Sequence, residues 1–186
     1  MASQRDRIVD AAVGMTTSSG WASVTMSRLA SQVGVSRQTV YNEIGGKPQL
    51  AEAMVLGELS RFLAVVEAGF DAEPADLAGA IERVVRDVLL FANDNRLLHA
   101  VVSATHGADT ELLPLLTTNA GSLLETAKEV VRGRVKTYQP QIEPERFEPA
   151  IDMVVRVVLS HVMQPSGSPE QTAGDLAWLV RRVLEG

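Results

Sequence analysis

Apolar residues recur along most of the chain at the spacing of one face of an α-helix. Between Ile81 and Leu89, and again between Phe147 and Val162, they fall three or four residues apart. Such a period is typical of amphipathic helices that bury one side against a core. No segment alternates apolar and polar residues between turn signals, as a half-buried β-strand would. The pattern therefore predicts an all-α protein.

Turn and capping residues divide this pattern into about nine helices. Gly20 and Gly34 end predicted helices, and Pro48 and Pro169 each stand in the first turn of another, where the missing N–H of proline costs nothing. The predicted helices cover approximately residues 3–18, 26–33, 37–43, 47–69, 75–93, 96–105, 110–137 and 144–163, and a last helix follows Ser168-Pro169.

The helices predicted at 26–33 and 37–43 are short and are joined by a tight turn. Gly34 permits the left-handed backbone that a Cβ would strain, and Val35 fills the corner. Ser36 is a residue type that caps the following helix by accepting a backbone N–H. Two short helices joined in this way form a helix-turn-helix, in which the second helix reads DNA.

The second of these helices carries polar side chains on one arc. Arg37, Gln38, Tyr41 and Asn42 fall within about 140° at about 3.6 residues per turn, whereas Val40 lies on the opposite flank. Guanidinium, amide and phenol groups are suited to guanine, adenine and phosphate contacts. The pattern by itself also fits an ordinary corner between two helices whose polar residues face solvent.

The longer stretch from Val24 to Leu50 resembles the DNA-binding head of the tetracycline repressor (TetR) family. The family pattern has a threonine before the second helix, Leu-Ala within it, Gly-Val-Ser at the turn, Thr-(Leu/Val)-Tyr in the reading helix and a lysine that opens the fourth helix. Within a match over residues 5–56, this chain has Thr25, Leu29-Ala30, Gly34-Val35-Ser36, Thr39-Val40-Tyr41 and Lys47. The resemblance implies a helix-turn-helix DNA-binding domain at residues 1–47 and a ligand-binding and dimerisation domain at residues 48–186.

The same resemblance implies a ligand-responsive repressor that binds a palindromic operator in double-stranded DNA as a homodimer. The residues that match the DNA-facing positions of the family are Thr25, Ser27, Arg37, Gln38, Thr39, Tyr41, Asn42 and Lys47. The chain departs from the family at Glu43-Ile44, where a His-Phe pair is usual. Ile44 still suits the core of the head, but Glu43 places a carboxylate where a phosphate contact is common.

Charge is unevenly distributed along the 186 residues, which carry a formal net charge of −6. Residues 1–48 hold five Lys and Arg against three Asp and Glu, which leaves a net charge of +2 for this part and −8 for the rest. A basic head on an acidic body confines the attraction for phosphate to the head.

Composition excludes several other classes of protein. Apolar residues make up 46% of the chain, as in an ordinary folded domain, and the absence of cysteine rules out disulfides, thiolate zinc sites and cysteine redox sensing. The most apolar stretch, Met153 to Met163, is interrupted by Arg156 and His161, and four charged residues lie among the first ten. We therefore expect a cytoplasmic protein with no membrane span and no secretory signal.

The ligand-binding and dimerisation domain at residues 48–186 is expected to hold an effector pocket. The few charges within the helices predicted at 75–137 favour a small, lipophilic effector. Each polar candidate also fits a surface position or a hydrogen-bonded core position. The candidate ligand-binding residues are Phe62, Phe91, Leu97, His99, Val102, Ser103, His106, Leu116, Asn119 and Met153.

The family resemblance implies that the dimer forms through the helix at 144–163 and the last helix. Both are apolar over more than one face, and the last helix carries Trp178 near the small residues Gly174 and Ala177, which let backbones approach. These residues also fit packing within a single chain. A dimer presents two reading helices to two half-sites, as a palindromic operator requires.

Two other functions fit parts of the sequence. His99, His106 and Asp109 resemble a metal or acid–base cluster, because the two histidines lie seven residues apart on one helical face. A third ligand with firm spacing is missing, however, and so are an HExxH motif and a glycine-rich phosphate loop. The other alternative is a helical ligand-binding or adaptor protein without DNA binding, against which the head motif argues. We therefore expect no enzyme activity, no cofactor and no bound metal.

Overall fold

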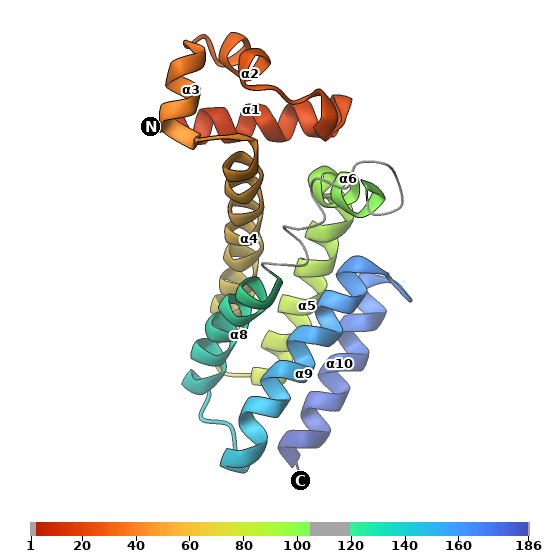
Figure 1. Cartoon of the computed structure of the whole chain (residues 1–186). Coiled ribbons are helices and arrows are strands. Elements are labelled where there is room, and N and C mark those ends of the chain that lie inside the picture. Colours follow the sequence, from red (N-terminus) through yellow and green to blue (C-terminus); the bar gives the residue numbers. More distant parts are fainter. Residues whose placement is uncertain (1–2, 105–119, 186) are drawn as a thin grey trace. The chain divides into compact units, whose positions relative to one another are not determined.

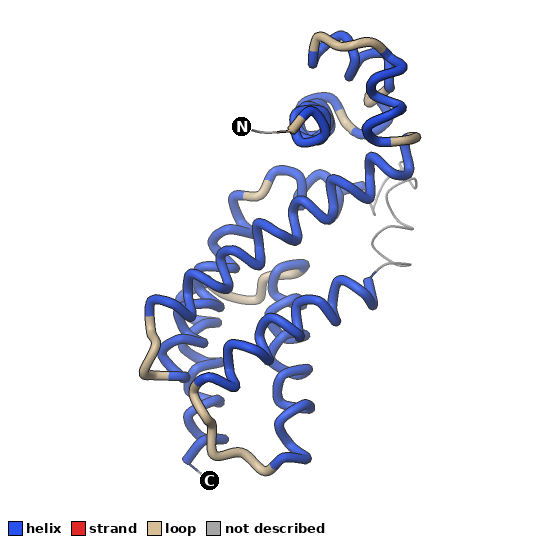
Figure 2. The backbone as a smooth tube through the Cα atoms, turned by 90° about the vertical axis from the view of Figure 1, so that its left-hand side faces the viewer, coloured by secondary structure: helices blue, strands red, loops and turns tan. Residues whose placement is uncertain are grey.

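The computed structural model describes residues 3–104 and 120–185 of the chain. Every regular element within these ranges is a helix, and no strand occurs among them (Figure 2). The all-α prediction is therefore confirmed. The chain divides into two compact units: unit 1 comprises the described residues up to Leu59 and those of the segment 95–120, and unit 2 comprises residues 60–94 and the described residues from Gly121 onward.

Unit 1 is built around the predicted helix-turn-helix. Its elements are α1 (Gln4–Ser19), the short 3-10 helix η1 (Trp21–Ser23), α2 (Met26–Val33), α3 (Arg37–Ile44), the first part of α4 (Lys47–Ala72) and α6 (Arg96–Ala104) (Figure 1). The bounds of α2 are those predicted, and α3 is one residue longer than predicted.

Capping residues account for the ends of the first helices. Ser3 caps α1 and exchanges hydrogen bonds with Asp6, whose carboxylate accepts the Ser3 backbone N–H at 2.8 Å and whose pKa is lowered by this bond. Thr25 caps α2 by accepting the backbone N–H of Arg28 at 3.2 Å. Gly34 ends α2 in the left-handed conformation (φ 76°, ψ 38°), which glycine adopts readily because it lacks a Cβ.

The core of unit 1 combines the apolar faces of its helices. Ile8 of α1, Leu29 of α2, Val40 of α3 and Leu50 of α4 are all 0% exposed. Leu97 of α6 belongs to the same cluster, because α6 packs against α1. The Leu97 side chain, predicted to line an effector pocket, is thus buried in the core of the head.

The side chain of Asn95 joins the start of α6 to α4. The side-chain oxygen of Asn95 accepts the backbone N–H of Leu98 at 2.8 Å, and the Asn95 amide donates to the Glu58 carboxylate at 2.6 Å. Asn95 thus caps α6 and at the same time fixes its first turn to α4.

Unit 2 consists of the remaining part of α4 together with α5 (Leu77–Asp94), α8 (Ala120–Thr137), α9 (Pro144–Met163) and α10 (Pro169–Glu185). The predicted bounds of α9 are confirmed. The helix predicted at 110–137 is described from Ala120 onward, because residues 105–119 lie outside the described part of the chain. None of the described helices is long and apolar enough to cross a membrane.

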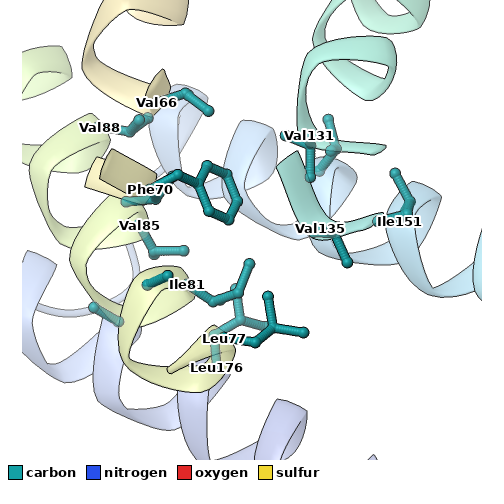
Figure 3. Packing of buried hydrophobic residues seen from close by; sticks show 14 of the residues in the cluster. Val66, Phe70, Leu77, Ile81, Val85, Val88, Val131, Val135, Ile151 and Leu176 are labelled. Carbon is teal, nitrogen blue, oxygen red and sulfur yellow. The ribbon is translucent and has the colours of Figure 1, made fainter. Parts of the chain in front are cut away.

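Among the described helices of unit 2, α5 and α10 make the most extensive contact. Phe70 of α4 and Val85 of α5 lie at the centre of the core and are at most 1% exposed (Figure 3). The backbones of α4 and α5 approach each other at Gly69, where a Cβ would lie 2.7 Å from Cγ2 of Val84. A Cβ at this position would force Val84 or one of the two helices to shift.

Polar contacts attach α8 to its neighbours. Arg132 of α8 grips the Glu148 carboxylate of α9 with two nitrogens (2.8 and 2.9 Å), and this guanidinium lowers the pKa of Glu148. Lys128 lies 3.0 Å from the Asp152 carboxylate of α9. At the end of α8, the Tyr138 hydroxyl donates to backbone carbonyl oxygens at the end of α4, and burial raises the pKa of this tyrosine. These contacts hold α8 to α9 and to α4.

Candidate nucleic-acid interface

The turn between α2 and α3 presents one face of α3 to solvent. The Ser36 hydroxyl accepts the backbone N–H of Thr39 at 3.0 Å and so caps α3. On the inner face, Val40 and Ile44 are 0% and 5% exposed. Ile44 therefore fills the core of the head, as predicted for this departure from the family pattern. Glu43 is exposed and keeps its carboxylate outside the core.

The polar arc predicted on α3 is exposed and internally ordered. Nη2 of Arg37 lies 3.3 Å from the Tyr41 hydroxyl, and the guanidinium carbon is 5.4 Å from the centroid of the Tyr41 ring. The Gln38 amide donates to the side-chain oxygen of Asn42 at 2.9 Å. Two pairs of side chains spaced by one helical turn thus lie side by side on the open face of α3.

The other predicted contact residues surround this arc. Thr25 and Ser27 are exposed at the start of α2, where the Thr25 hydroxyl already serves as the helix cap. The Thr39 hydroxyl is half-buried and lies 2.8 Å from the Ser36 hydroxyl. Lys47, the first residue of α4, holds its ammonium 4.8 Å from the centroid of the buried Trp21 ring, a cation–π contact that orients the charge. All eight residues of the predicted set belong to unit 1.

Sequence reasoning missed the role of three other basic residues of the head. Nη1 of Arg5 donates to the backbone carbonyl of Glu43 at 2.6 Å, and Nη2 of Arg7 donates to that of Val33 at 3.1 Å. Arg28 also donates to a backbone carbonyl, at 2.7 Å. A cation at a helix C-terminus compensates the macrodipole and satisfies a carbonyl that lacks a helical partner. Three of the five basic residues counted in the head therefore hold helix ends together.

The candidate effector residues that the structure describes belong to both units. Phe62 and Phe91 meet edge to face, with ring centroids 4.8 Å apart, between α4 and α5. His99 lies exposed on α6 of unit 1, and Met153 is 69% exposed on α9. The described part of the structure does not include residues His106, Leu116 and Asn119, or the side chains of Val102 and Ser103.

Several large apolar side chains of α9 and α10 are exposed. Ala177, predicted to let the backbones of two protomers approach, is instead 0% exposed within its own chain. The neighbouring Trp178 is 56% exposed, which is unusual for a tryptophan that packs within a single chain. The outer apolar side chains of these two helices are Met153, Val157, Leu159, Met163, Trp178, Leu179 and Val183. They are called the outer apolar face below.

Comparison with known families matches both parts of the chain. Residues 8–54 match the family described as bacterial regulatory proteins, tetR family, and residues 76–182 match the C-terminal domain of the bacterial tetracyclin repressor. The first match contains the helix-turn-helix, and the second extends from the residue before α5 into α10.

Individual proteins give the same result. The chain is 26% identical, over 97% of its length and 85% of the relative, to the HTH-type transcriptional regulator AlkX of Mycobacterium tuberculosis (strain ATCC 25618 / H37Rv). It is 28% identical to the TetR family repressor AlkX from Dietzia sp. strain DQ12-45-1b, implicated in biodegradation of n-alkanes, with a TM-score of 0.75 over 98% of this chain and 96% of that one. The regulator PfmR from Thermus thermophilus shares the fold at 19% identity, with a TM-score of 0.59 over 100% and 98% of the two chains.

The capped helix-turn-helix, the exposed polar arc of α3 and the two family matches agree with one another. An adaptor without DNA binding is not favoured, because the head and the body both match regulators. The chain therefore belongs to the TetR family of bacterial regulatory proteins and is a ligand-responsive, DNA-binding transcriptional repressor.

Proposed function

We propose that this repressor reads a palindromic operator with the polar arc of α3, and that residues 1–47 form its DNA-binding head. The observation that carries the proposal is the exposed, ordered pair of contacts Arg37–Tyr41 and Gln38–Asn42 on the one face of α3 that the core does not use. Such side chains, presented together on a reading helix, fit base edges in the major groove.

Each polar residue has a role that its chemistry favours. Arg37 grips a guanine edge with two hydrogen bonds, and Gln38 and Asn42 bind adenine. Lys47 contacts a phosphate from the N-terminus of α4, where the helix dipole also favours an anion. The remaining members of the DNA-binding set, Thr25, Ser27, Thr39 and Tyr41, contact phosphate oxygens or neighbouring base edges.

The homodimer forms through α9 and α10. Seven large apolar side chains of α9 and α10 are exposed, and their burial against a partner would favour association, which supports these two helices as the interface. A two-fold dimer then presents two copies of α3 to successive major grooves, which is the geometry that a palindromic operator requires.

The effector is small and lipophilic, and its binding releases the operator. The edge-to-face contact of Phe62 and Phe91 supplies an apolar starting point for its pocket. A similar protein, AlkX of Dietzia, is implicated in biodegradation of n-alkanes, which favours an effector of hydrocarbon character. Helix α6 is well suited to transmit a structural change caused by effector binding to the DNA-binding head. Its Leu97 is buried in the core of the head, and Asn95 at its start binds Glu58 of α4.

Binding of genomic DNA fragments to the full chain tests the reading surface. Arg37→Ala should relax the base preference and cost roughly 1–3 kcal/mol per half-site. Lys47→Ala should weaken binding to all sequences about equally and reduce the salt dependence, because phosphate contacts release counterions. Arg146→Ala, which removes an exposed basic residue of unit 2, is the matched control and should leave both properties unchanged. A preference that survives in Arg37→Ala but changes in Lys47→Ala would reverse the assigned roles.

A further inference from the structure

Two arginines of α1 each bond the C-terminal end of another helix of the head. Nη1 of Arg5 donates to the backbone carbonyl of Glu43 at 2.6 Å, where the start of α1 lies beside the end of α3 (Figure 1). Nη2 of Arg7 donates to the carbonyl of Val33, the last residue of α2, at 3.1 Å. Both carbonyls are among the last four of their helices, which have no amide partner within the helix. Arg5 and Arg7 thus attach the ends of α3 and α2 to α1.

The contact from Arg5 is important for α3 because the chain that leaves this helix is a pair of glycines. Gly45 has a φ of 93°, and Gly46 follows it before α4 begins at Lys47. Glycine restrains the backbone less than any other residue. The start of α3, by contrast, is fixed by the tight turn from α2 and by the Ser36 cap. The chain itself therefore restrains the end of α3 less than its start.

The buried side chains of α3 leave one motion of this helix weakly opposed. Val40 and Ile44 anchor it in the core and are 0% and 5% exposed. They are four residues apart, so they lie on one stripe along the helix. Anchors on a single line resist sliding but allow the helix to rotate about that line. Glu43 lies about 100° around the helix from Ile44, so the bond from Arg5 acts away from the line and opposes the rotation.

A rotation of this kind affects the two ends of the polar arc unequally. Asn42 directly precedes Glu43, whereas Arg37 is the first residue of α3, about 7.5 Å away along the helix axis. Because the turn fixes the start of α3, a rotation displaces Asn42 more than Arg37. Groups that bind a ligand have to be held within about 0.5 Å of the required geometry. The base contact made by Asn42 should therefore depend on Arg5 more than the contact made by Arg37.

We propose that Arg5 is a positioning residue for operator recognition. Its bond to the Glu43 carbonyl sets the orientation of the C-terminal half of α3, and with it the base pair that Asn42 selects. This inference rests on the proposed function, in which the polar arc reads DNA. The competing role for Arg5 is a direct contact with a phosphate, because its side chain is exposed and a guanidinium has five N–H groups, of which the carbonyl takes one.

Binding of the full chain to a set of short DNA duplexes tests the proposal. One duplex carries the operator recovered from the genomic fragments, and each of the others has one base pair changed in both half-sites. Asn42→Ala and Arg37→Ala identify the base pairs whose discrimination depends on each of these side chains. Arg5→Ala should reduce discrimination at the Asn42 base pair at least about threefold and at the Arg37 base pair less than about twofold.

A matched control and the salt dependence separate positioning from the other roles of an arginine. Arg28 is also exposed and donates to the backbone carbonyl of Ser23 at 2.7 Å, but at the start of α2. Arg28→Ala removes the same charge and the same kind of bond, and should not weaken discrimination at the Asn42 base pair selectively. Loss of a phosphate contact would reduce the slope of log affinity against log salt by about one, whereas Arg5→Ala should change it by less than about half of that.

The outcomes distinguish this inference from the proposed function. If Arg5→Ala weakens binding to all duplexes equally, Arg5 contacts a phosphate or only stabilises the head, and the inference is overturned. It is overturned as well if Arg5→Ala binds every duplex like the wild type. If neither Arg37→Ala nor Asn42→Ala alters the base preference, the reading surface itself is wrong and the proposed function fails. Circular dichroism checks the fold, and Arg5→Met, which keeps the aliphatic stem without a donor, replaces Arg5→Ala if that variant unfolds.

Discussion

Trp178 offers the most direct test of the dimer interface. Its indole is 56% exposed on α10, whereas the adjacent Ala177 is wholly buried within the chain. Trp178→Ala therefore removes apolar surface from the outer apolar face, and an arginine at position 177 would instead disrupt the core of unit 2. We expect the Trp178→Ala protein to remain folded but to dissociate into monomers more readily than the wild type.

The exposed fraction sets the size of the effect. An aromatic residue of this size has up to about 250 Å² to bury, so the exposed part of Trp178 is roughly 140 Å². At about 25 cal/mol per Å², full coverage of this part would contribute roughly 3 kcal/mol per protomer. A two-fold interface contains the residue twice. A partner covers only part of each ring, and alanine keeps some apolar surface. We therefore expect the free energy of dimerisation to weaken by about 3–4 kcal/mol per dimer, which corresponds to a dissociation constant roughly 100–1,000-fold higher.

Sedimentation velocity over a dilution series measures this dissociation constant. The matched control is Leu90→Ala, which removes an exposed apolar side chain (42%) from α5 and should leave the dimer unchanged. Circular dichroism checks that both variants keep their helices. An unaltered dissociation constant in Trp178→Ala, or an equal rise in Leu90→Ala, would refute the assignment of the interface to α9 and α10.

Two further predictions concern the stability of the fold. Gly69→Ala places a Cβ 2.7 Å from Val84 Cγ2 and 3.1 Å from its Cα, so thermal unfolding should show a free energy of unfolding lower by about 1–2 kcal/mol. In the control Gly57→Ala, on the same helix, the new Cβ meets nothing within 4 Å, and the free energy of unfolding should rise by up to about 1 kcal/mol. Equal effects of the two changes would refute the close approach. The pKa of Glu148 is lowered from its ordinary value of 4.5 by Arg132, so this carboxylate stabilises the fold above that value and ceases to do so as the pH falls through the lowered pKa. In urea unfolding from about pH 6 to about pH 3, Glu148→Gln should therefore lose less stability than the wild type, and parallel curves would contradict this role.

The head illustrates how local sequence can predict both helix bounds and an exposed site. Gly34 and Ser36 act on backbone groups within a few residues of themselves, and the helices they delimit have the expected bounds at the turn. The exposed arc of α3 follows equally from helical periodicity, because Val40 has to face the core. Which bases or phosphates these side chains contact stays a prediction.

The sequence by itself thus determined the helices, their caps, the helix-turn-helix and the polar arc on its second helix. Only the tertiary structure decided which long-range partners the side chains have. Arg5 was counted as a source of phosphate attraction but donates to a carbonyl 38 residues away. The apolar pattern of Leu97 fits more than one core, and only the structure places this side chain in the core of the head. The physical reason is that caps and periodicity depend on atoms a few residues apart, whereas burial and cavities depend on how separate helices pack.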